Sequence, residues 1–290
     1  MRLQQTSLVL ALWAAFGGSI FMLVSTPASH LATTVGDLLS SFGSQLAAPL
    51  RAEEDDTNPF LPSEHVMADV DATLARAKAA DKLALIVLGA NWCHDSQGLA
   101  AHLDSPEMQD VIARKYELLK IDVGLFEHGD DVVQRFGQPV IYGTPTVFVI
   151  DPVGEQVLNR KSMHQWRAAA SISLKDTVEY FEGQSRDAAK DELVDPSKAN
   201  LKAALKKIDD FEAQQATRIA EAYKVLGPLV GLPRDERPEN FYDMWEQVRV
   251  LRYKLPDDLL RLRAIARRKA AYTDEAISVD LPEYAPFSWE

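Results

Sequence analysis

The sequence predicts an α/β fold, a central mixed sheet flanked by helices, followed by an all-helical C-terminal extension. Between residues 62 and 183, short apolar runs of strand length alternate with segments of helical periodicity. After residue 184, apolar residues recur at intervals of three and four over stretches too long for strands. A chain of 290 residues with 47% hydrophobic and 26% charged residues has the composition of a globular protein with one or two domains.

The first 61 residues lack the pattern of a folded domain. Residues 1–28 are typical of a signal peptide or a membrane anchor, because an apolar run from Leu8 to Val24 follows a single charge and precedes small residues up to Ala28. Residues 29–61 have the composition of a flexible acidic linker. Both alternatives predict a periplasmic or otherwise exported protein. Only the uncleaved form predicts membrane contact, through residues 8–24.

Residues 62–183 predict one α/β domain, in which an opening helix precedes the order strand, helix, strand, helix, strand, strand, helix. The apolar run at 83–88 indicates a central strand that is covered on both faces. Ser105-Pro106 is typical of a helix start. The predicted strands are 83–88, 116–123, 146–150 and 155–158, and the predicted helices are 66–80, one ending near 103, one starting at 106, 130–136 and 173–181.

Residues 184–290 predict a helical extension with an irregular tail. We expect helices at 197–226, 241–254 and 256–271, with Gly227-Pro228 ending the first and Pro256 opening the third. Glu212 and Gln215 interrupt the apolar stripe of the first helix, so it is not a regular coiled coil. The tail at 281–290 contains two prolines and three aromatic residues, and we expect it to lie across a groove or to bind a partner in extended form.

The net charge of −12 arises from 31 Lys and Arg against 43 Asp and Glu, which argues against a general nucleic-acid-binding protein. Residues 1–197 carry 15 basic and 27 acidic residues, whereas residues 198–290 carry 16 of each. This change in charge supports a domain boundary. Between residues 249 and 269 there are 8 basic and 2 acidic residues, which indicates either a solvated helix face or a docking surface for an acidic partner or for the acidic domain of the same chain.

The sequence predicts no metal site and no cofactor. Its histidines are scattered without ligand spacing, and no glycine-rich phosphate loop is present. The chain has one cysteine, Cys93, which excludes an intrachain disulfide, a cysteine-rich zinc site and a two-cysteine redox cycle within one chain.

Cys93 lies where the strand at 83–88 gives way to a helix. A thiol at a helix N-terminus faces unpaired backbone N–H groups and the positive end of the helix dipole, and both favour the nucleophilic thiolate. A protonated His94 would add to this effect, and Asp95 would oppose it. We therefore expect Cys93 to be reactive, with an inert packed thiol as the alternative.

Residues 65–182 resemble the thioredoxin family in three motifs. Trp92-Cys93-His94-Asp95-Ser96 opens a helix after a buried strand, as the family's Trp-Cys-x-x-Cys does. Gly143-Thr144-Pro145-Thr146 is similar to the family's cis-proline loop, and Lys120-Ile121-Asp122 fits the strand between the two. The resemblance implies a thioredoxin-like fold. Trp92 would then shield one side of the thiol, and the Thr144 backbone before a cis Pro145 would pair with an extended substrate.

Three positions depart from the family pattern. Ser96 stands where the resolving cysteine would be, and a serine hydroxyl cannot attack a mixed disulfide at neutral pH, although it can donate a hydrogen bond to the thiolate. Val87 stands in place of the family's buried aspartate, and Asp95 in place of its proline. These differences argue against an ordinary dithiol reductase.

Two hypotheses for function follow from the motif. In the first, an exported single-thiol protein forms mixed disulfides with client proteins or a small thiol through Cys93. In the second, a non-catalytic or chaperone-like binding module has lost redox turnover. The helical extension would bind a protein partner in either case. The candidate catalytic residues are Cys93, Ser96 and His94, and the candidate substrate-binding residues are Trp92, Asp95, Thr144 and Pro145.

Overall fold

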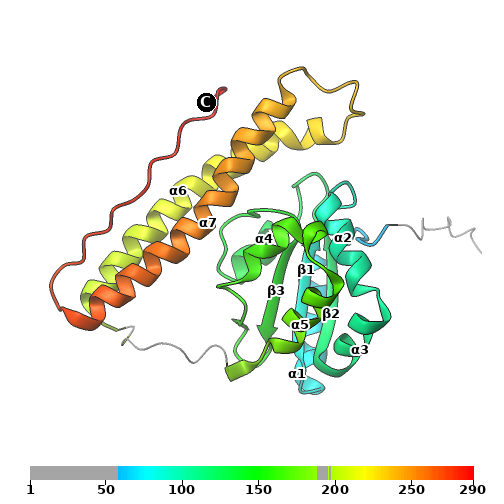
Figure 1. Ribbon diagram of the computed structural model, residues 1–290, viewed down its shortest axis with the longest axis horizontal. Helices are drawn as coiled ribbons and strands as arrows, with labels where there is room; N and C mark the ends of the chain where they lie inside the picture. Colours follow the sequence, from blue (N-terminus) through cyan, green and yellow to red (C-terminus); the bar gives the residue numbers. More distant parts are fainter. Residues whose placement is uncertain (1–57, 188–194, 196) are drawn as a thin grey trace, which may run out of the picture. The chain divides into compact units, whose positions relative to one another are not determined.

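The computed structural model describes residues 58–187, 195 and 197–290 (Figure 1). The predicted signal peptide or anchor at 1–28 and nearly all of the predicted linker at 29–61 lie outside the described residues. Within the described ranges, no helix combines the length and the apolar character that a membrane crossing needs.

A four-stranded mixed sheet forms the centre of the α/β domain, as predicted. The strands lie in the order β2-β1-β3-β4. β1 is parallel to β2 and antiparallel to β3, and β4 adds a short antiparallel edge. Their bounds are β1 (Leu83–Gly89), β2 (Tyr116–Asp122), β3 (Thr146–Asp151) and β4 (Gln156–Val157).

The central strand β1 is buried along its whole length, and its alternate side chains enter two separate cores. Ala84, Ile86 and Leu88 belong to one hydrophobic cluster. Leu83, Leu85 and Val87 belong to the other. This alternation is the period-two geometry of a strand with both faces covered, which the apolar run predicted.

Helices cover both faces of the sheet. α1 (Val66–Ala79) and α4 (Asp130–Arg135) supply the first cluster, while α2 (His94–Leu103), α3 (Pro106–Lys115) and α5 (Leu174–Gly183) supply the second. A 3₁₀ helix, η1 (Met163–Ser171), was not predicted. Its buried residues Met163, Trp166 and Ala169 recur every third position, which is the period of a 3₁₀ helix.

The helical extension contains two long helices among the described residues, not the three that were predicted. α6 (Ala199–Val230) and α7 (Phe241–Tyr272) pack side by side (Figure 1). The prediction that Gly227-Pro228 ends the first helix was wrong, because α6 continues through Pro228 to Val230. The prediction of a break before Pro256 was also wrong, because this proline lies inside α7.

The surroundings of Gly227 and Pro256 show how each residue fits within its helix. Gly227 is required by close packing, because a Cβ atom there would lie 2.3 Å from the Leu125 carbonyl oxygen. Pro256 removes the N–H that would bond the Arg252 carbonyl four residues earlier. The Arg167 guanidinium replaces it, with Nη1 donating to the carbonyls of Arg252 at 3.3 Å and Tyr253 at 2.8 Å.

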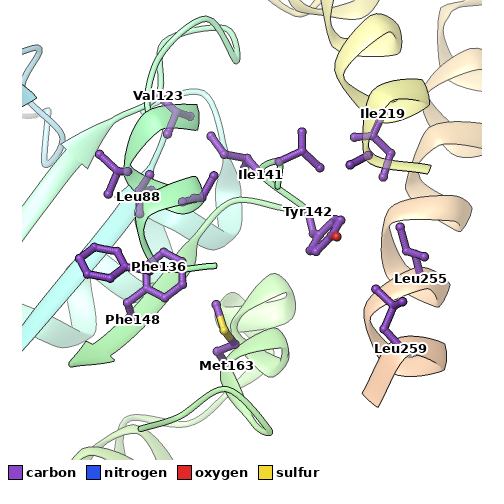
Figure 2. Packing of buried hydrophobic residues seen from close by; sticks show 14 of the residues in the cluster. Leu88, Val123, Phe136, Ile141, Tyr142, Phe148, Met163, Ile219, Leu255 and Leu259 are labelled. Carbon is purple, nitrogen blue, oxygen red and sulfur yellow. The ribbon is translucent and has the colours of Figure 1, made fainter. Parts of the chain in front are cut away.

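One hydrophobic cluster contains residues of both the α/β domain and the extension. Figure 2 shows Ile141 and Tyr142 of the domain facing Ile219, Leu255 and Leu259 of the two long helices. The polar residues that interrupt the α6 stripe are themselves buried, with Glu212 8% and Gln215 6% exposed. They interrupt the hydrophobic pattern without leaving the buried face.

The C-terminal tail lies along its own helices (Figure 1). Phe287 is buried, and Arg218 of α6 donates to the Ala285 carbonyl at 2.8 Å and pairs with Glu290. In the basic stretch at 249–269, Arg252 is buried, and Arg249 and Arg261 each pair with an acid on the same helix. Part of this stretch is therefore packed within the chain and is not a solvated face, and a docking surface for an acidic partner stays a prediction.

Candidate functional site

Cys93 is the N-cap residue of α2, immediately after the turn that follows β1, as predicted. Its backbone N–H donates to the Ala90 carbonyl at 3.0 Å, and its carbonyl accepts the Gln97 N–H at 3.0 Å. The side chain is half-buried. A thiol in this position faces the helix end at which backbone N–H groups favour a negative charge.

The loop before β3 brings Thr144 and Pro145 to the thiol. Cys93 Sγ donates to the Thr144 carbonyl oxygen at 3.3 Å across 51 residues of sequence. The Thr144–Pro145 peptide bond is cis, and Thr144 is buried. Within the loop, Thr146 Oγ1 donates to the Gly143 carbonyl at 2.7 Å. Three predicted site residues therefore meet in one place.

Ser96 is fully buried beneath the start of α2. Its Oγ accepts the Ala90 N–H at 3.2 Å and so holds the turn between β1 and the helix. The predicted hydrogen bond from Ser96 to the sulfur is not formed among the described residues, where the Sγ partner is the Thr144 carbonyl. The position of the missing second sulfur thus holds a buried structural hydroxyl.

His94 and Asp95 point to different surroundings. His94 is exposed to solvent. Asp95 is half-buried, and its Oδ1 accepts the Ala170 N–H at 3.0 Å, which ties α2 to η1. This bond occupies one carboxylate oxygen of Asp95, so its predicted contact with a substrate remains a prediction that rests on the second oxygen. The predicted role of His94 also stays a prediction.

Trp92 belongs to an aromatic cluster that the sequence did not indicate. Its Nε1 donates to the Gly124 carbonyl at 2.7 Å. Its ring makes edge contacts with Phe126, at 5.2 Å between centroids, and with Trp245 of α7, at 6.0 Å. Phe126 in turn stacks on Tyr223 of α6 at 4.0 Å. The helical period places Trp245 on one face of its helix, but no spacing in the sequence connects it with Trp92.

Burial shifts the pKa of three side chains outside the cysteine motif, those of Asp122, Tyr142 and Tyr223. Burial raises the pKa of Asp122 at the end of β2, although the Gly124 N–H that bonds the carboxylate acts in the opposite direction. Burial also raises the pKa of Tyr142 and of Tyr223. Both phenols are therefore protonated at neutral pH and serve as hydrogen-bond donors. The described residues include no group of three or more His, Cys, Asp or Glu side chains that could hold a metal ion.

Comparison with known proteins points to the same region of the chain. Residues 65–152 match a protein-family model described as thioredoxin-like. A solved structure, the disulphide isomerase from Xylella fastidiosa Temecula1, is 30% identical to this chain, with a TM-score of 0.38. That alignment covers 42% of this chain and 95% of the isomerase chain. A search of curated proteins finds no match. The family match includes both Cys93 and the Thr144–Pro145 loop.

Proposed function

This chain belongs to the thioredoxin family, and from that premise we propose that it exchanges thiols and disulfides through Cys93 alone. The observation that carries the proposal is the half-buried thiol at the N-cap of α2, with its Sγ 3.3 Å from the Thr144 carbonyl. The neighbouring loop offers backbone groups to an extended substrate.

The first step is attack on a disulfide of a client protein or a small thiol compound. The Cys93 thiolate attacks one sulfur, the client's S–S bond breaks, and a mixed disulfide forms between Cys93 and the client. The second client sulfur leaves as a thiolate with the electron pair. No external oxidant or reductant takes part, because the disulfide itself is the oxidised substrate.

The second step needs an external thiol. The chain has one cysteine, and the buried Ser96 hydroxyl is bonded to the Ala90 N–H. A second thiolate from solution attacks the mixed disulfide, releases Cys93 as a thiolate and leaves with the client sulfur. The proposed protein is thus a single-thiol exchange protein, whose cycle depends on the thiol supply around it.

Export is part of the same proposal. Mixed disulfides persist in oxidising compartments, and the sequence of residues 1–28 is typical of a signal peptide or an anchor. Sequencing the N-terminus of the mature protein and fractionating the cells test this part. A mature chain that starts near residue 29 outside the cytoplasm supports a cleaved leader, an intact N-terminus in a membrane fraction supports an anchor, and an intact N-terminus in the soluble cytoplasm refutes export.

A non-catalytic binding module is the second candidate function. The contact between Trp92 and Trp245 favours it, because it brings α7 of the extension to the residue that precedes Cys93. In this function the same loop would hold an extended peptide without bond exchange. The two candidates differ in whether removal of Cys93 abolishes capture of the peptide.

The test uses an extended peptide whose cysteine is linked to 2-thiopyridine as a disulfide. At pH 7, we expect folded wild-type protein to release thiopyridone about tenfold faster than the same chain unfolded in urea. Intact-mass spectrometry should show protein plus peptide, stable until glutathione is added. Cys93→Ala should give no adduct. Peptide affinity that is unchanged in Cys93→Ala would favour the binding module, and equal rates for folded and unfolded chains would refute an activated thiol.

A designed second sulfur provides a matched control. Ser96→Cys restores the two-cysteine spacing, and we expect this variant to release the peptide from the mixed disulfide without added thiol. Lys78→Cys adds a cysteine at an exposed position in the last turn of α1, next to the start of β1 and so at the opposite end of that strand from Cys93, and it should leave the adduct stable at low protein concentration. Spontaneous release from wild type would contradict the requirement for an external thiol.

A further inference from the structure

The three residues before Thr144 are each held by a side chain tied to the helical extension. Tyr223 of α6 donates its hydroxyl to the Ile141 carbonyl at 2.8 Å. The Tyr142 hydroxyl donates to Glu212 Oε1 of α6 at 2.6 Å. Gly143 lies against Arg167, whose Cγ would be 3.1 Å from a Cβ at that glycine. Residues 141, 142 and 143 are thus each contacted, and the next residue, Thr144, is the one that accepts the hydrogen bond of Cys93.

The loop needs such partners because it has no regular structure of its own. Residues 138–145 form neither helix nor strand, and Ile141, Tyr142 and Thr144 are buried. Buried backbone groups outside helices and sheets must find other hydrogen-bond partners. Domain side chains supply two of them, with Thr146 donating to the Gly143 carbonyl and Gln138 to the Val140 carbonyl. The extension supplies a third, because Tyr223, 82 residues away, donates to the Ile141 carbonyl.

Glu212 shows that this contact is specific. The residue interrupts the apolar stripe of α6, yet it is buried and bonded to both Tyr142 and Arg263. A buried carboxylate is costly unless its oxygens are paired. Helix periodicity alone does not explain why a glutamate lies on the packed face of α6. Its hydrogen bond with Tyr142 does.

Arg167 connects the same loop with α7. Its aliphatic part packs on Gly143, and its Nη1 donates to the two carbonyls of α7 next to Pro256. The Tyr253 ring lies 4.5 Å from the guanidinium, and the Tyr253 hydroxyl donates back to the Arg167 carbonyl at 3.1 Å. The Arg252 carbonyl, which Pro256 leaves without its helical donor, thus accepts a hydrogen bond from Arg167 and helps to fix Arg167 against Gly143.

We infer that the helical extension positions the substrate loop, with Tyr223, Glu212 and Arg167 holding residues 141–143 so that Thr144 faces Cys93. The inference rests on the proposed function, because it concerns the backbone that an extended substrate would pair with. These three are positioning residues, since they act through the loop and touch neither the sulfur nor the peptide. Extended peptides depend on the loop, whereas a small symmetrical disulfide needs only the thiol.

The test compares two reagents on the same variants. One is the peptide linked to 2-thiopyridine, and the other is 2,2′-dithiodipyridine, which has no backbone to pair with Thr144. In Tyr223→Phe and in Tyr142→Phe, we expect the peptide rate to fall about fivefold, the effect of one lost hydrogen bond, while the small-reagent rate stays constant. The ratio of the two rates is the readout, measured well below the melting temperature of each variant.

Tyr284→Phe is the matched control. It removes a phenol hydroxyl within the extension, one that donates to Asp258 at 2.8 Å and does not contact the loop. Because Tyr284 is partly exposed, we expect its melting temperature to shift no more than those of the other two variants, and its rate ratio to equal that of wild type. A role in stability alone would lower melting temperatures without moving the ratio.

The outcomes separate the two proposals. A ratio that is unchanged in both Tyr223→Phe and Tyr142→Phe, with a reactive Cys93, overturns the positioning role and leaves the exchange function intact. A ratio that falls equally in Tyr284→Phe also overturns it. Wild-type rates no faster than those of the unfolded chain with both reagents refute the exchange function itself. A selective loss in the two loop variants supports the inference.

Discussion

The α/β domain and the helical extension differ in where their buried polar groups find partners. In the domain, two buried polar side chains bond backbone groups that are close to them in the chain: Ser96 Oγ accepts the Ala90 N–H, and Gln138 Nε2 donates to the Val140 carbonyl at 2.8 Å. In the extension, buried Glu212 and Tyr223 bond residues of the domain instead. Three buried nitrogens have no hydrogen-bond partner among the described residues: Trp166 Nε1 in the domain, and Arg252 Nε and Nη1 in the extension.

This difference shows what each region needs in order to fold. The sheet satisfies its own backbone, so the polar side chains of the domain close turns and strand edges. The extension has a buried face whose polar positions are complementary to one loop of the domain. Two helices alone would leave Glu212 and Tyr223 without these partners, which is why we regard the extension as part of the site and not as an independent appendage.

The largest effect should come from a local partner in the domain. Asn159 is 2% exposed and continues the sheet edge beyond β4, with Oδ1 accepting the Val149 N–H and Nδ2 donating to the Val147 carbonyl, both at 2.9 Å. Asn159→Ala leaves two buried backbone groups unpaired, so we expect a loss of about 3 kcal/mol in the free energy of unfolding, measured by urea denaturation.

The matched residue in the extension is Asn200. Asn159 makes a third hydrogen bond, from Nδ2 to the Tyr180 hydroxyl at 3.1 Å, and Asn200 also makes three, with Leu201, Thr273 and Glu275. Asn200 is partly exposed, however, so water replaces the lost amide. We expect Asn200→Ala to cost about 1 kcal/mol or less. Equal losses in the two variants would contradict the view that burial, and not the number of bonds, sets the difference.

His164, whose ring lies beside that of Tyr142, should make stability depend on pH, with an effect of intermediate size. Burial, together with the charges of Arg167 and Arg160, lowers the pKa of His164 from 6.5 to about 3. Between about pH 3 and pH 6.5, His164 is therefore protonated in the unfolded chain and neutral in the folded chain. Stability is therefore complete above pH 6.5 and falls as the pH drops toward 3. We expect His164 to account for a loss of about 2 kcal/mol between pH 7 and pH 5 in urea denaturation.

Two histidine variants isolate this contribution. His164→Gln keeps a polar side chain without a titratable ring, so its free energy of unfolding should fall less between pH 7 and pH 5 than that of wild type. His128→Gln changes an exposed histidine and should leave the wild-type slope unaltered. A slope in His164→Gln equal to that of wild type would show that the folded His164 titrates normally.

Local patterns in the sequence predicted the sheet, the α-helices of the domain but not its 3₁₀ helix η1, and the meeting of Cys93 with Thr144 and Pro145. Each of these depends on residues near one another in the chain or on a motif with a fixed place in the fold. The sequence did not predict the contacts of Trp92 with Trp245 or of Tyr142 with Glu212. These pairs join distant segments, and side-chain type and spacing carry no information about which distant surface a helix face meets.

The two wrong predictions of a helix end, at Gly227-Pro228 and before Pro256, both concern a proline that lies inside a helix. Replacing these prolines should give the smallest of the predicted effects. A proline inside a helix leaves the carbonyl four residues earlier without its N–H donor. Pro228 is exposed in the last turn of α6, so we expect Pro228→Ala to raise the free energy of unfolding by about 1 kcal/mol. Pro256 is buried, and Arg167 already donates to the freed Arg252 carbonyl.

An alanine N–H at position 256 would compete with Arg167 for that carbonyl, and the smaller side chain would leave a void where the proline ring was packed. We therefore expect Pro256→Ala to raise the free energy of unfolding by less than Pro228→Ala does, or to lower it, in parallel urea titrations. Equal gains in the two variants would mean that the Arg167 bonds contribute nothing to holding α7 against the domain. A smaller gain for Pro256→Ala than for Pro228→Ala shows that Arg167 of the α/β domain offsets the cost of the carbonyl that Pro256 leaves without its helical donor.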